Sequence, residues 1–354
     1  MTRRASIIVR SMGRAELSDA LASLAAQTHP AIEIVLVDAT GGRHPPPPAA
    51  CGPHAVRFVA GAAPRSRPAA ANAGLDAATG DYIGFLDDDD SLDPEHVSVL
   101  VAALDAHPGY AVAYSAAREV DGDGALVRIR AEPYSRHLLF QDSYVMLQTA
   151  LIRQELRRSC RFDPTFDVFE DWDFWIQASA VTDFLQVARE TVIYRSSLGR
   201  SGLGRGANRD VAVIETYRRR IATKWRAEGE RAARELEDCY REAERAFAQR
   251  DFSRAQELVR GVLAAYRYHV GALSLAGTLA ALSGEFARAA EHFALAAREA
   301  PSDPAAHFNL AQALEREGRV NDAIAAYRRV LALSPAHPHA GARLRRLDTS
   351  AEQA

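Results

Sequence analysis

The chain has 354 residues, enough for two or three domains, and its 48% hydrophobic and 25% charged residues are an ordinary globular balance. A formal net charge of −3 excludes a broad electrostatic attraction to nucleic acid or to an anionic membrane. The cysteines Cys51, Cys160 and Cys239 lie far apart without metal-type spacing, so they indicate neither a disulfide framework nor a zinc site.

The N-terminus leads directly into an apolar, strand-like run and shows no signal-peptide core. No segment approaches the roughly 20 apolar residues that span a bilayer. We therefore expect a cytoplasmic protein, and peripheral contact with the inner membrane remains compatible with the sequence.

Strand-like and helix-like segments alternate from residue 5 to about residue 115. The expected strands are 6–9, 32–37, 56–59, 82–86 and 111–114, and the expected helices are 15–27, 69–78 and 94–107. Nearly continuous apolar strands favour a mostly parallel sheet with helices on both faces, an α/β fold. Ligands of such sheets bind beyond the carboxyl ends of the strands, where Asp38 and Asp87 both lie.

Two further segments of this half have recognisable turn chemistry. Residues 120–129, around the turn Asp121–Gly124, are typical of a hairpin. Residues 41–52 include four consecutive prolines from Pro45, which predicts a surface loop near the ligand site but outside it.

From about residue 236 the pattern is helical only, and it repeats. Ala255, Ala289 and Ala323 are spaced by 34 residues. The same spacing separates Gly277 from Ala311, Phe293 from Tyr327 and Pro301 from Pro335. This pattern resembles the tetratricopeptide repeat, with repeats at about 236–269, 270–303 and 304–337 and a capping helix that ends the domain near residue 348. The alternative is an amphipathic helical bundle with accidental periodicity.

Residues 205–235 are expected to form a helical bridge between the two halves. They are too apolar for a free linker, so we expect them to pack on the first domain, residues 1–204.

The strongest local signal is the segment Gly80–Pro94, which contains four adjacent carboxylates, Asp87 to Asp90, at the end of a strand. Such carboxylates repel one another unless a cation or a hydrogen-bond network compensates. Hard oxygen ligands at this density suit Mg²⁺ or Mn²⁺. The alternative is a solvated acidic loop that caps the next helix.

Together with Ala70–Gly74, this segment resembles the motif A-x-N-x-G…F-L-D-x-D-D-x-L-x-P of family 2 glycosyltransferases, which have the GT-A fold. The resemblance extends over about residues 5–201. It implies that Asp89 coordinates the metal that bridges the donor diphosphate. It also implies that Asp87 contacts the donor ribose or the metal, directly or through water, with Asp90 in support.

The same resemblance implies donor contacts by Asp38, Arg14 and Asn72. Asp38 matches the first aspartate of the family's V-D-D-G-S motif, and Ala39 replaces the second. Arg14 matches the last residue of P-T-Y-N-R, whose proline and aromatic residue are missing here. Two alternatives stay open: Asp38 as a turn-initiating residue and Asn72 as an ordinary helix residue. Arg65 and Arg67 are equal candidates for a basic residue near the diphosphate.

Glu170-Asp171-Trp172-Asp173 follows Arg161–Phe166 and resembles the family's F-D…E-D-W-D segment. By this resemblance Asp171 is the catalytic base, which takes a proton from the acceptor hydroxyl. Glu170 then holds the local network or touches the acceptor. The alternative is an acidic N-terminal cap on a helix at 172–180.

The family often has a histidine soon after a Tyr-Arg pair, but Tyr194-Arg195 is followed by Ser196 and Ser197. The glycine-rich residues 198–206, with Arg200 and Arg205, are typical of either a closing loop or a tether.

The resemblance implies a metal-dependent, inverting transfer of a hexosyl group from a nucleoside-diphosphate-sugar. The acceptor would be a glycan, lipid-linked or protein hydroxyl, in bacterial surface glycan or glycoconjugate assembly. The repeats would bind a protein partner or a second copy of the chain, and no nucleic acid partner is expected. One alternative is a degenerate transferase that acts as a scaffold through its repeats. Another is a nucleotidyltransferase, which the glycine-poor turn after the first strand disfavours.

Overall fold

The computed structural model describes residues 2–195 and 210–351. The chain divides into two compact units, residues 1–226 and residues 227–354. Within the described ranges, no helix combines the length and the apolar character that crossing a bilayer requires.

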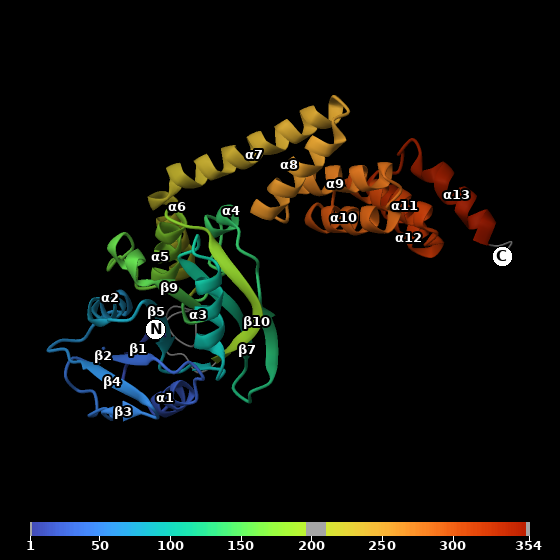
Figure 1. Ribbon diagram of the computed structural model, residues 1–354. Helices are drawn as coiled ribbons and strands as arrows, with labels where there is room; N and C mark the ends of the chain where they lie inside the picture. The colour runs from blue at the N-terminus through green and yellow to red at the C-terminus, as the bar shows by residue number, and fades with distance from the viewer. Residues whose placement is uncertain (1, 196–209, 352–354) are drawn as a thin grey trace. The chain divides into compact units, whose positions relative to one another are not determined.

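The first unit is built on a mixed sheet that has ten strands within residues 2–195 (Figure 1). The strands are β1 (Ala5–Ser11), β2 (Ile32–Asp38), β3 (Ala50–Cys51), β4 (His54–Val59), β5 (Tyr82–Asp87), β6 (Ser91–Leu92), β7 (Val112–Val120), β8 (Leu126–Arg130), β9 (Ala150–Arg153) and β10 (Phe184–Arg195). Their order is β3-β4-β2-β1-β5-β9-β7-β10-β6, and β8 pairs with β7. The longer ladders, β4-β2-β1-β5 and β7-β10, are parallel, which confirms the expected mostly parallel sheet.

Helices cover both faces of this sheet, because the apolar strands point side chains in both directions. The helices of the first unit are α1 (Leu17–Ala25), α2 (Arg67–Ala77), α3 (His96–Ala106), α4 (Arg136–Leu139), α5 (Glu170–Ser179) and α6 (Val211–Lys224). Along β1, Ile8 joins the core beneath α2 and α5, whereas Ile7 and Val9 join the core beneath α1 and α3. Figure 1 shows α1 and α2 on opposite faces of β1, β2 and β4.

The expected strands and helices up to residue 114 are confirmed, with differences at their ends. The last expected strand extends to Val120 as β7, which forms the predicted hairpin with β8. The helix expected at 172–180 begins two residues earlier, at Glu170. The short antiparallel strand β9 separates β5 from β7 and was not expected, because four residues carry no clear periodicity.

The expected helical bridge is divided between the two units. α6 packs on the core of the first unit, where Ile221 is buried and Ile214, Tyr217 and Trp225 contact the core. The next helix, α7 (Arg226–Ala248), begins at the last residue of the first unit and belongs otherwise to the second.

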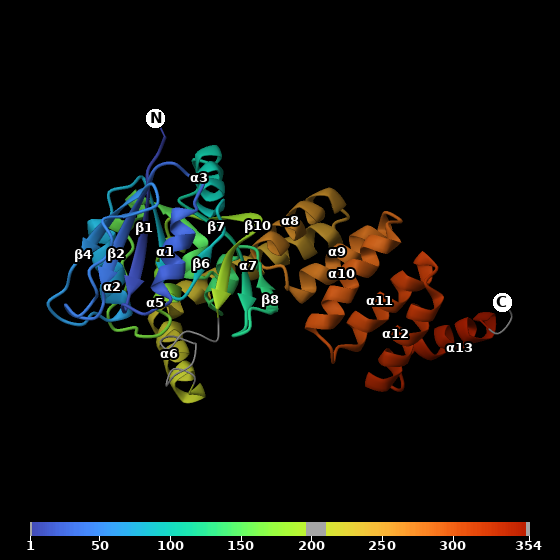
Figure 2. The same cartoon turned by 90° about the horizontal axis from the view of Figure 1, so that it is seen from below.

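The second unit consists of paired helices (Figure 2). They are α7 (Arg226–Ala248), α8 (Phe252–Ala265), α9 (Val270–Leu282), α10 (Phe286–Glu299), α11 (Pro304–Glu317), α12 (Val320–Leu333) and the final α13 (Ala340–Ala351). Ala255, Ala289 and Ala323 are all fully buried. At Gly277, an added Cβ would lie 2.7 Å from the Phe293 ring, so these two positions pack in direct contact. The repeat in the sequence is therefore a repeat in the packing.

Candidate active site

A cavity of about 440 Å³ opens beside the carboxyl ends of β1 and β5. Carboxylates and arginines dominate its lining. The acidic residues are Asp87, Asp88, Asp89, Asp90, Asp167, Glu170 and Asp171, and the arginines are Arg10, Arg14, Arg65, Arg67, Arg130 and Arg195. This position agrees with the expectation that ligands bind at the ends of parallel strands.

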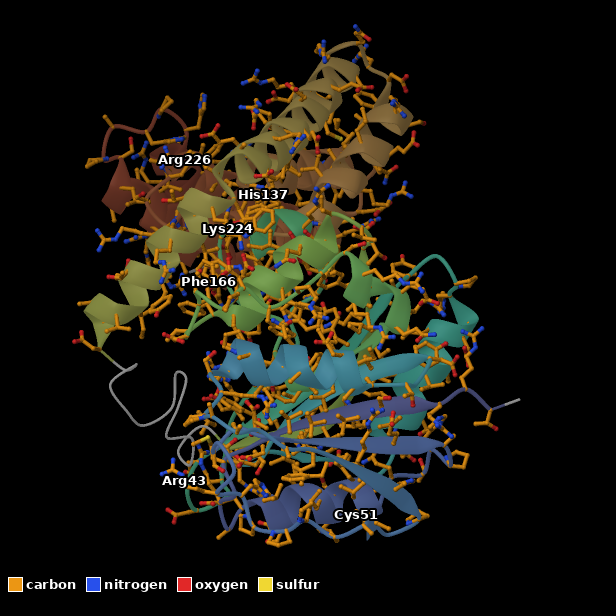
Figure 3. The ribbon with its side chains drawn as sticks, turned by 90° about the vertical axis from the view of Figure 1, so that its left-hand side faces the viewer. Arg43, Cys51, His137, Phe166, Lys224 and Arg226 are labelled. Carbon is orange, nitrogen blue, oxygen red and sulfur yellow. The ribbon has the colours of Figure 1, made fainter. Side chains whose placement is uncertain are left out.

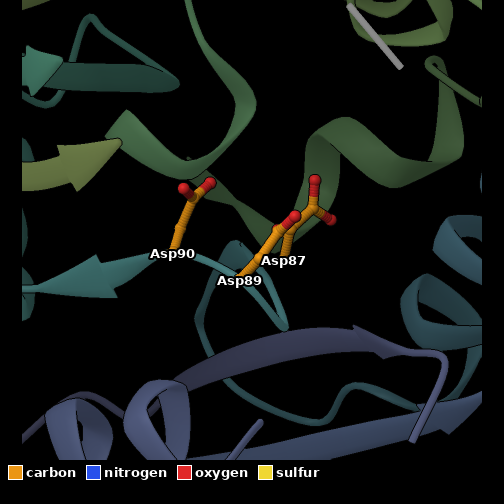
Figure 4. A group of neighbouring side chains, drawn as sticks. All are labelled: Asp87, Asp89 and Asp90. Atoms are coloured by element: carbon orange, nitrogen blue, oxygen red, sulfur yellow. The ribbon is translucent and has the colours of Figure 1, made fainter. Parts of the chain in front are cut away.

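Three of these carboxylates form a compact group where β5 ends (Figure 4). Asp87, Asp89 and Asp90 each offer one oxygen atom within 4.8 Å of the others. Asp90 is buried, and it accepts hydrogen bonds from Gln148 Nε2 at 2.8 Å and from the backbone N–H of Arg195 at 3.2 Å. Burial, and then the charge of Asp89, raise the pKa of Asp90 well above its usual value.

The charge of Asp89 is only partly compensated, by Arg14. Burial, and then the charges of Asp87 and Asp88, raise its pKa to about 6. Arg14 Nη1 lies 3.3 Å from Asp89 Oδ2 and 3.4 Å from Asp88 Oδ1. Three oxygen ligands that repel one another are the donor set that hard divalent cations bind, so the residues present fit Mg²⁺ or Mn²⁺.

Asp88 supports the loop that follows β1. Its Oδ2 accepts a hydrogen bond from the backbone N–H of Met12 at 2.8 Å and a longer one from the Ser11 hydroxyl at 3.3 Å. Asp88 therefore fixes the turn that brings Arg14 to the cavity. Arg14 is thus near the position in which the sequence predicted a donor contact.

Two arginines and the carboxylates of Asp87 and Glu170 form an ion-pair network on one side of the cavity. Glu170 is buried, whereas the Asp87 side chain is 28% exposed. Arg10, on β1, donates from Nε to Asp87 Oδ1 at 2.8 Å and from Nη2 to Asp87 Oδ2 at 2.9 Å. Its Nη1 donates to Glu170 Oε1 at 2.8 Å. Arg67 contacts the same two carboxylates, at 3.3 Å from Asp87 and 3.1 Å from Glu170. Burial alone would raise the pKa of Asp87, but Arg10 and Arg67 together lower it.

The contacts of Glu170, Arg67 and Arg65 bear on roles that the sequence left open. Glu170 holds the local network, one of the two roles considered for it. Of the two candidate arginines, Arg67 reaches the carboxylates, whereas Arg65 donates to the backbone oxygens of Asp38 at 2.7 Å and Ala60 at 2.9 Å. Arg10 was missed. The signal that could have revealed it is a charged residue at the end of a fully buried strand, which must have a charged partner.

Asp171 lines the cavity at the start of α5. Burial, and then the charge of Glu170, raise its pKa above the usual range. The preceding Phe169 has a left-handed backbone with φ of 63°, an uncommon conformation for an aromatic residue. A carboxylate with a raised pKa is a stronger proton acceptor than an ordinary one, as the task of a general base requires.

Asp38 and Asn72 lie outside the cavity lining. Asp38 accepts hydrogen bonds at 2.7 Å from the backbone N–H groups of Thr40 and Gly42, as a turn-initiating residue does. The Asn72 amide donates to the backbone oxygen of Phe162 at 2.8 Å and accepts from its N–H at 3.1 Å. The structure thus uses both side chains to hold the backbone, and the donor contacts expected of them stay predictions. Ser196, Ser197 and the glycine-rich residues 198–206 lie outside the described residues.

Comparison with known families identifies both units. Residues 6–164 match the glycosyl transferase family 2 model, and residues 240–304 and 284–338 match the tetratricopeptide repeat model. The chain therefore carries a family 2 glycosyltransferase domain with a GT-A-type fold, followed by tetratricopeptide repeats.

Two curated relatives match part of the chain. Uncharacterized protein y4gI of Sinorhizobium fredii is 28% identical over 109 residues, and the O-antigen biosynthesis protein RfbC of Myxococcus xanthus is 26% identical over 219 residues. These matches cover 30% and 58% of this chain but only 12% and 16% of the relatives.

Solved structures are similar at lower identity. S. aureus TarS is 17% identical, with a TM-score of 0.48 over 88% of this chain and 54% of TarS. The first tetratricopeptide domain of human RPAP3 is 19% identical, with a TM-score of 0.31 over 33% of this chain and 93% of that domain.

Proposed function

We propose that the first unit is a metal-dependent, inverting glycosyltransferase that moves a hexosyl group from a nucleoside-diphosphate-sugar to an acceptor hydroxyl. The observation that supports this most directly is the content of one cavity in a family 2 glycosyltransferase domain. A compact group of carboxylate oxygens from Asp87, Asp89 and Asp90 and the carboxylate of Asp171 line the same cavity.

The chemistry follows from these positions. Asp89, with Asp87 and Asp90, would hold Mg²⁺ or Mn²⁺, which when bound supplies positive charge for the leaving nucleoside diphosphate. Asp171 accepts the proton of the acceptor hydroxyl while that oxygen forms a bond to the anomeric carbon. The bond between the anomeric carbon and the diphosphate oxygen breaks at the same time, which inverts the configuration. Arg14 lies beside Asp89 and is suited to stabilise the charge that develops on the diphosphate.

The biological setting is proposed from the relatives and the family. RfbC carries the name of an O-antigen biosynthesis protein, which supports a role in bacterial surface glycan or glycoconjugate assembly. The acceptor would be a glycan, a lipid-linked or a protein hydroxyl. The repeats would bind a protein partner or a second copy of the chain.

Calorimetric titration of UDP, dTDP and GDP, with and without Mn²⁺, tests the donor site. We expect tight binding of one nucleotide that requires both Mn²⁺ and Asp89, so that Asp89→Ala abolishes it. Asp76→Ala is the matched control, because Asp76 is an exposed carboxylate in a surface ion pair with Arg161. If no nucleotide binds to the wild-type protein, the transferase proposal fails and the scaffold alternative gains support.

A further inference from the structure

Lysine is almost absent from this chain. Of the 43 lysine and arginine residues, only Lys224 is a lysine. It is the last residue of α6, and its Nζ lies 2.8 Å from Asp163 Oδ2 and 2.8 Å from Asp173 Oδ1. The Lys224 Nζ also lies 5.2 Å from the centre of the Phe166 ring. Figure 3 labels both residues. Lys224 thus joins the two ends of the segment 163–173.

One of its partners is a fully buried carboxylate on the helix that carries Asp171. Asp173 is 0% exposed and lies in the first turn of α5, two residues after Asp171. Besides Lys224, it accepts hydrogen bonds from Trp225 Nε1 and Gln177 Nε2, each at 2.8 Å. Two of the three donors are therefore Lys224, the last residue of α6, and Trp225, the residue that follows it.

Other residues of α6 contact the same segment. The Arg218 guanidinium lies 5.8 Å from the Phe169 ring centre and 5.6 Å from the Trp172 ring, so it covers the residues on both sides of Glu170 and Asp171. Arg220 lies 4.9 Å from the Phe166 ring and donates to the Thr165 backbone oxygen. Residues 163–173 are thus held by α6 at several places.

The backbone at this point needs such support. Phe169 holds its left-handed conformation directly before the helix, and such strain persists only where the surroundings enforce it. The match to the family model ends at residue 164. The support for the segment that carries Asp171 therefore comes from a helix well beyond that match.

We propose that Lys224 is a positioning residue for Asp171 and that α6 is a working part of the transferase domain. The proposal rests on the proposed function. Lys224 holds Asp163 and Asp173 in place, and the backbone between them fixes the direction of the Asp171 carboxylate. It does not touch the donor site, so its loss should affect the chemical step and leave donor binding intact.

The test compares Lys224→Met, Lys224→Arg and wild type. Nucleoside diphosphate release is measured from UDP-glucose, UDP-N-acetylglucosamine, dTDP-glucose and GDP-mannose with Mn²⁺. We expect Lys224→Met to lower kcat by about 10–100-fold with little change in KM, the size of effect that a small misplacement of a reacting group produces. Lys224→Arg should restore most of the activity, because arginine can also pair with two carboxylates. Arg219→Met is the control on the same helix, because Arg219 is exposed and donates a hydrogen bond to the backbone oxygen of Glu215 within α6.

Hydrogen exchange supplies a readout that does not depend on turnover. Amides of residues 166–175 should exchange faster in Lys224→Met, whereas amides of β1 and β5 should not change. Should Lys224→Met fail to fold, Asp163→Asn removes one of the two carboxylate partners and is expected to have the same effects at smaller size.

The outcomes separate the two proposals. A Lys224→Met protein with wild-type kcat, or with faster exchange throughout the first unit, overturns the positioning role alone. A wild-type protein that binds no nucleotide overturns the transferase proposal and the positioning role with it.

Discussion

Replacing Arg10 by methionine should strongly destabilise the first unit. Arg10 is only 7% exposed and pairs with Asp87 through two hydrogen bonds and with Glu170 through one. Methionine fills much of the same volume but leaves the buried carboxylate of Glu170 and the partly exposed one of Asp87, with Arg67 still in contact with both. Removing one partner from a buried ion pair costs about 3–5 kcal/mol, so we expect a loss of that size near neutral pH.

The loss should depend on pH, and the sign follows from the pKa of Asp87. In the wild-type protein this pKa is lowered, so the carboxylate contributes stability that is present above its unfolded pKa and disappears as the pH falls. In Arg10→Met only Arg67 and Arg14 still lower this pKa, so it should lie higher than in wild type, and a falling pH should cost the variant less stability. The difference in unfolding free energy between the two proteins should therefore be largest near pH 8 and narrow below about pH 5.

Urea unfolding followed by tryptophan fluorescence measures this difference. All tryptophans, Trp172, Trp175 and Trp225, lie in the first unit, so the signal does not report on the repeats. Arg161→Met is the control, because its ion pair with Asp76 is exposed and should contribute about 1 kcal/mol or less.

A double variant sharpens the result. Combining Arg10→Met with Glu170→Gln removes the carboxylate charge that lost its arginine partner, so the double variant should recover part of the stability. Such recovery would measure the coupling between these two residues in contact. A loss below about 1 kcal/mol for Arg10→Met at pH 8, or a loss that does not change with pH, would refute the reasoning.

Three further predictions concern single sites. Asp171→Asn should keep Mn²⁺-dependent nucleotide binding but lower sugar transfer by about 10²–10⁴-fold in a nucleotide-release assay, and near-wild-type transfer would rule it out as the base. Burial lowers the pKa of His96 to about 3, so below about pH 6.5 the unfolded chain binds a proton that the folded protein rejects. Wild type should thus lose about 2 kcal/mol more than His96→Gln between pH 8 and pH 5 in urea unfolding, and equal losses would show that His96 does not stay neutral. Gly277→Ala places a Cβ against Phe293 and should destabilise the repeats by about 1–3 kcal/mol in thermal unfolding followed by circular dichroism. Gly261→Ala, where a Cβ meets open space, should not destabilise them, and equal effects at both glycines would contradict the packing argument.

The sequence predicted those parts of the fold that local patterns determine. Continuous apolar strands indicated the parallel core, and small residues at a constant spacing indicated the helix pairs. β10 was missed because Gln186, Arg189 and Glu190 interrupt its apolar pattern, although it pairs along nearly the whole of β7. Strand pairing of that kind depends on distant residues that a single segment does not reveal.

The candidate site residues that could be predicted were those that belong to a recognisable sequence motif. The strand end at Asp87 and the helix start at Asp171 placed both residues at one cavity. The Arg10–Glu170 pair joins residues 160 positions apart, and the Lys224–Asp163 pair joins residues 61 apart. No spacing rule connects such residues, so only the folded chain shows them. Asp38 had two interpretations. The structure shows the hydrogen bonds of the local one, a turn within its own loop, and the donor contact stays a prediction.

The regular period of the second unit also bears on how such a chain can change in length. Gly277 and Ala311, and likewise Phe293 and Tyr327, occupy equivalent places in successive helix pairs. An in-frame duplication of the gene segment for residues 270–303 would insert a helix pair whose two new contact surfaces copy ones that already exist. Gene duplication can therefore change the number of repeats one helix pair at a time, while the sequence of the sheet and its cavity stays the same.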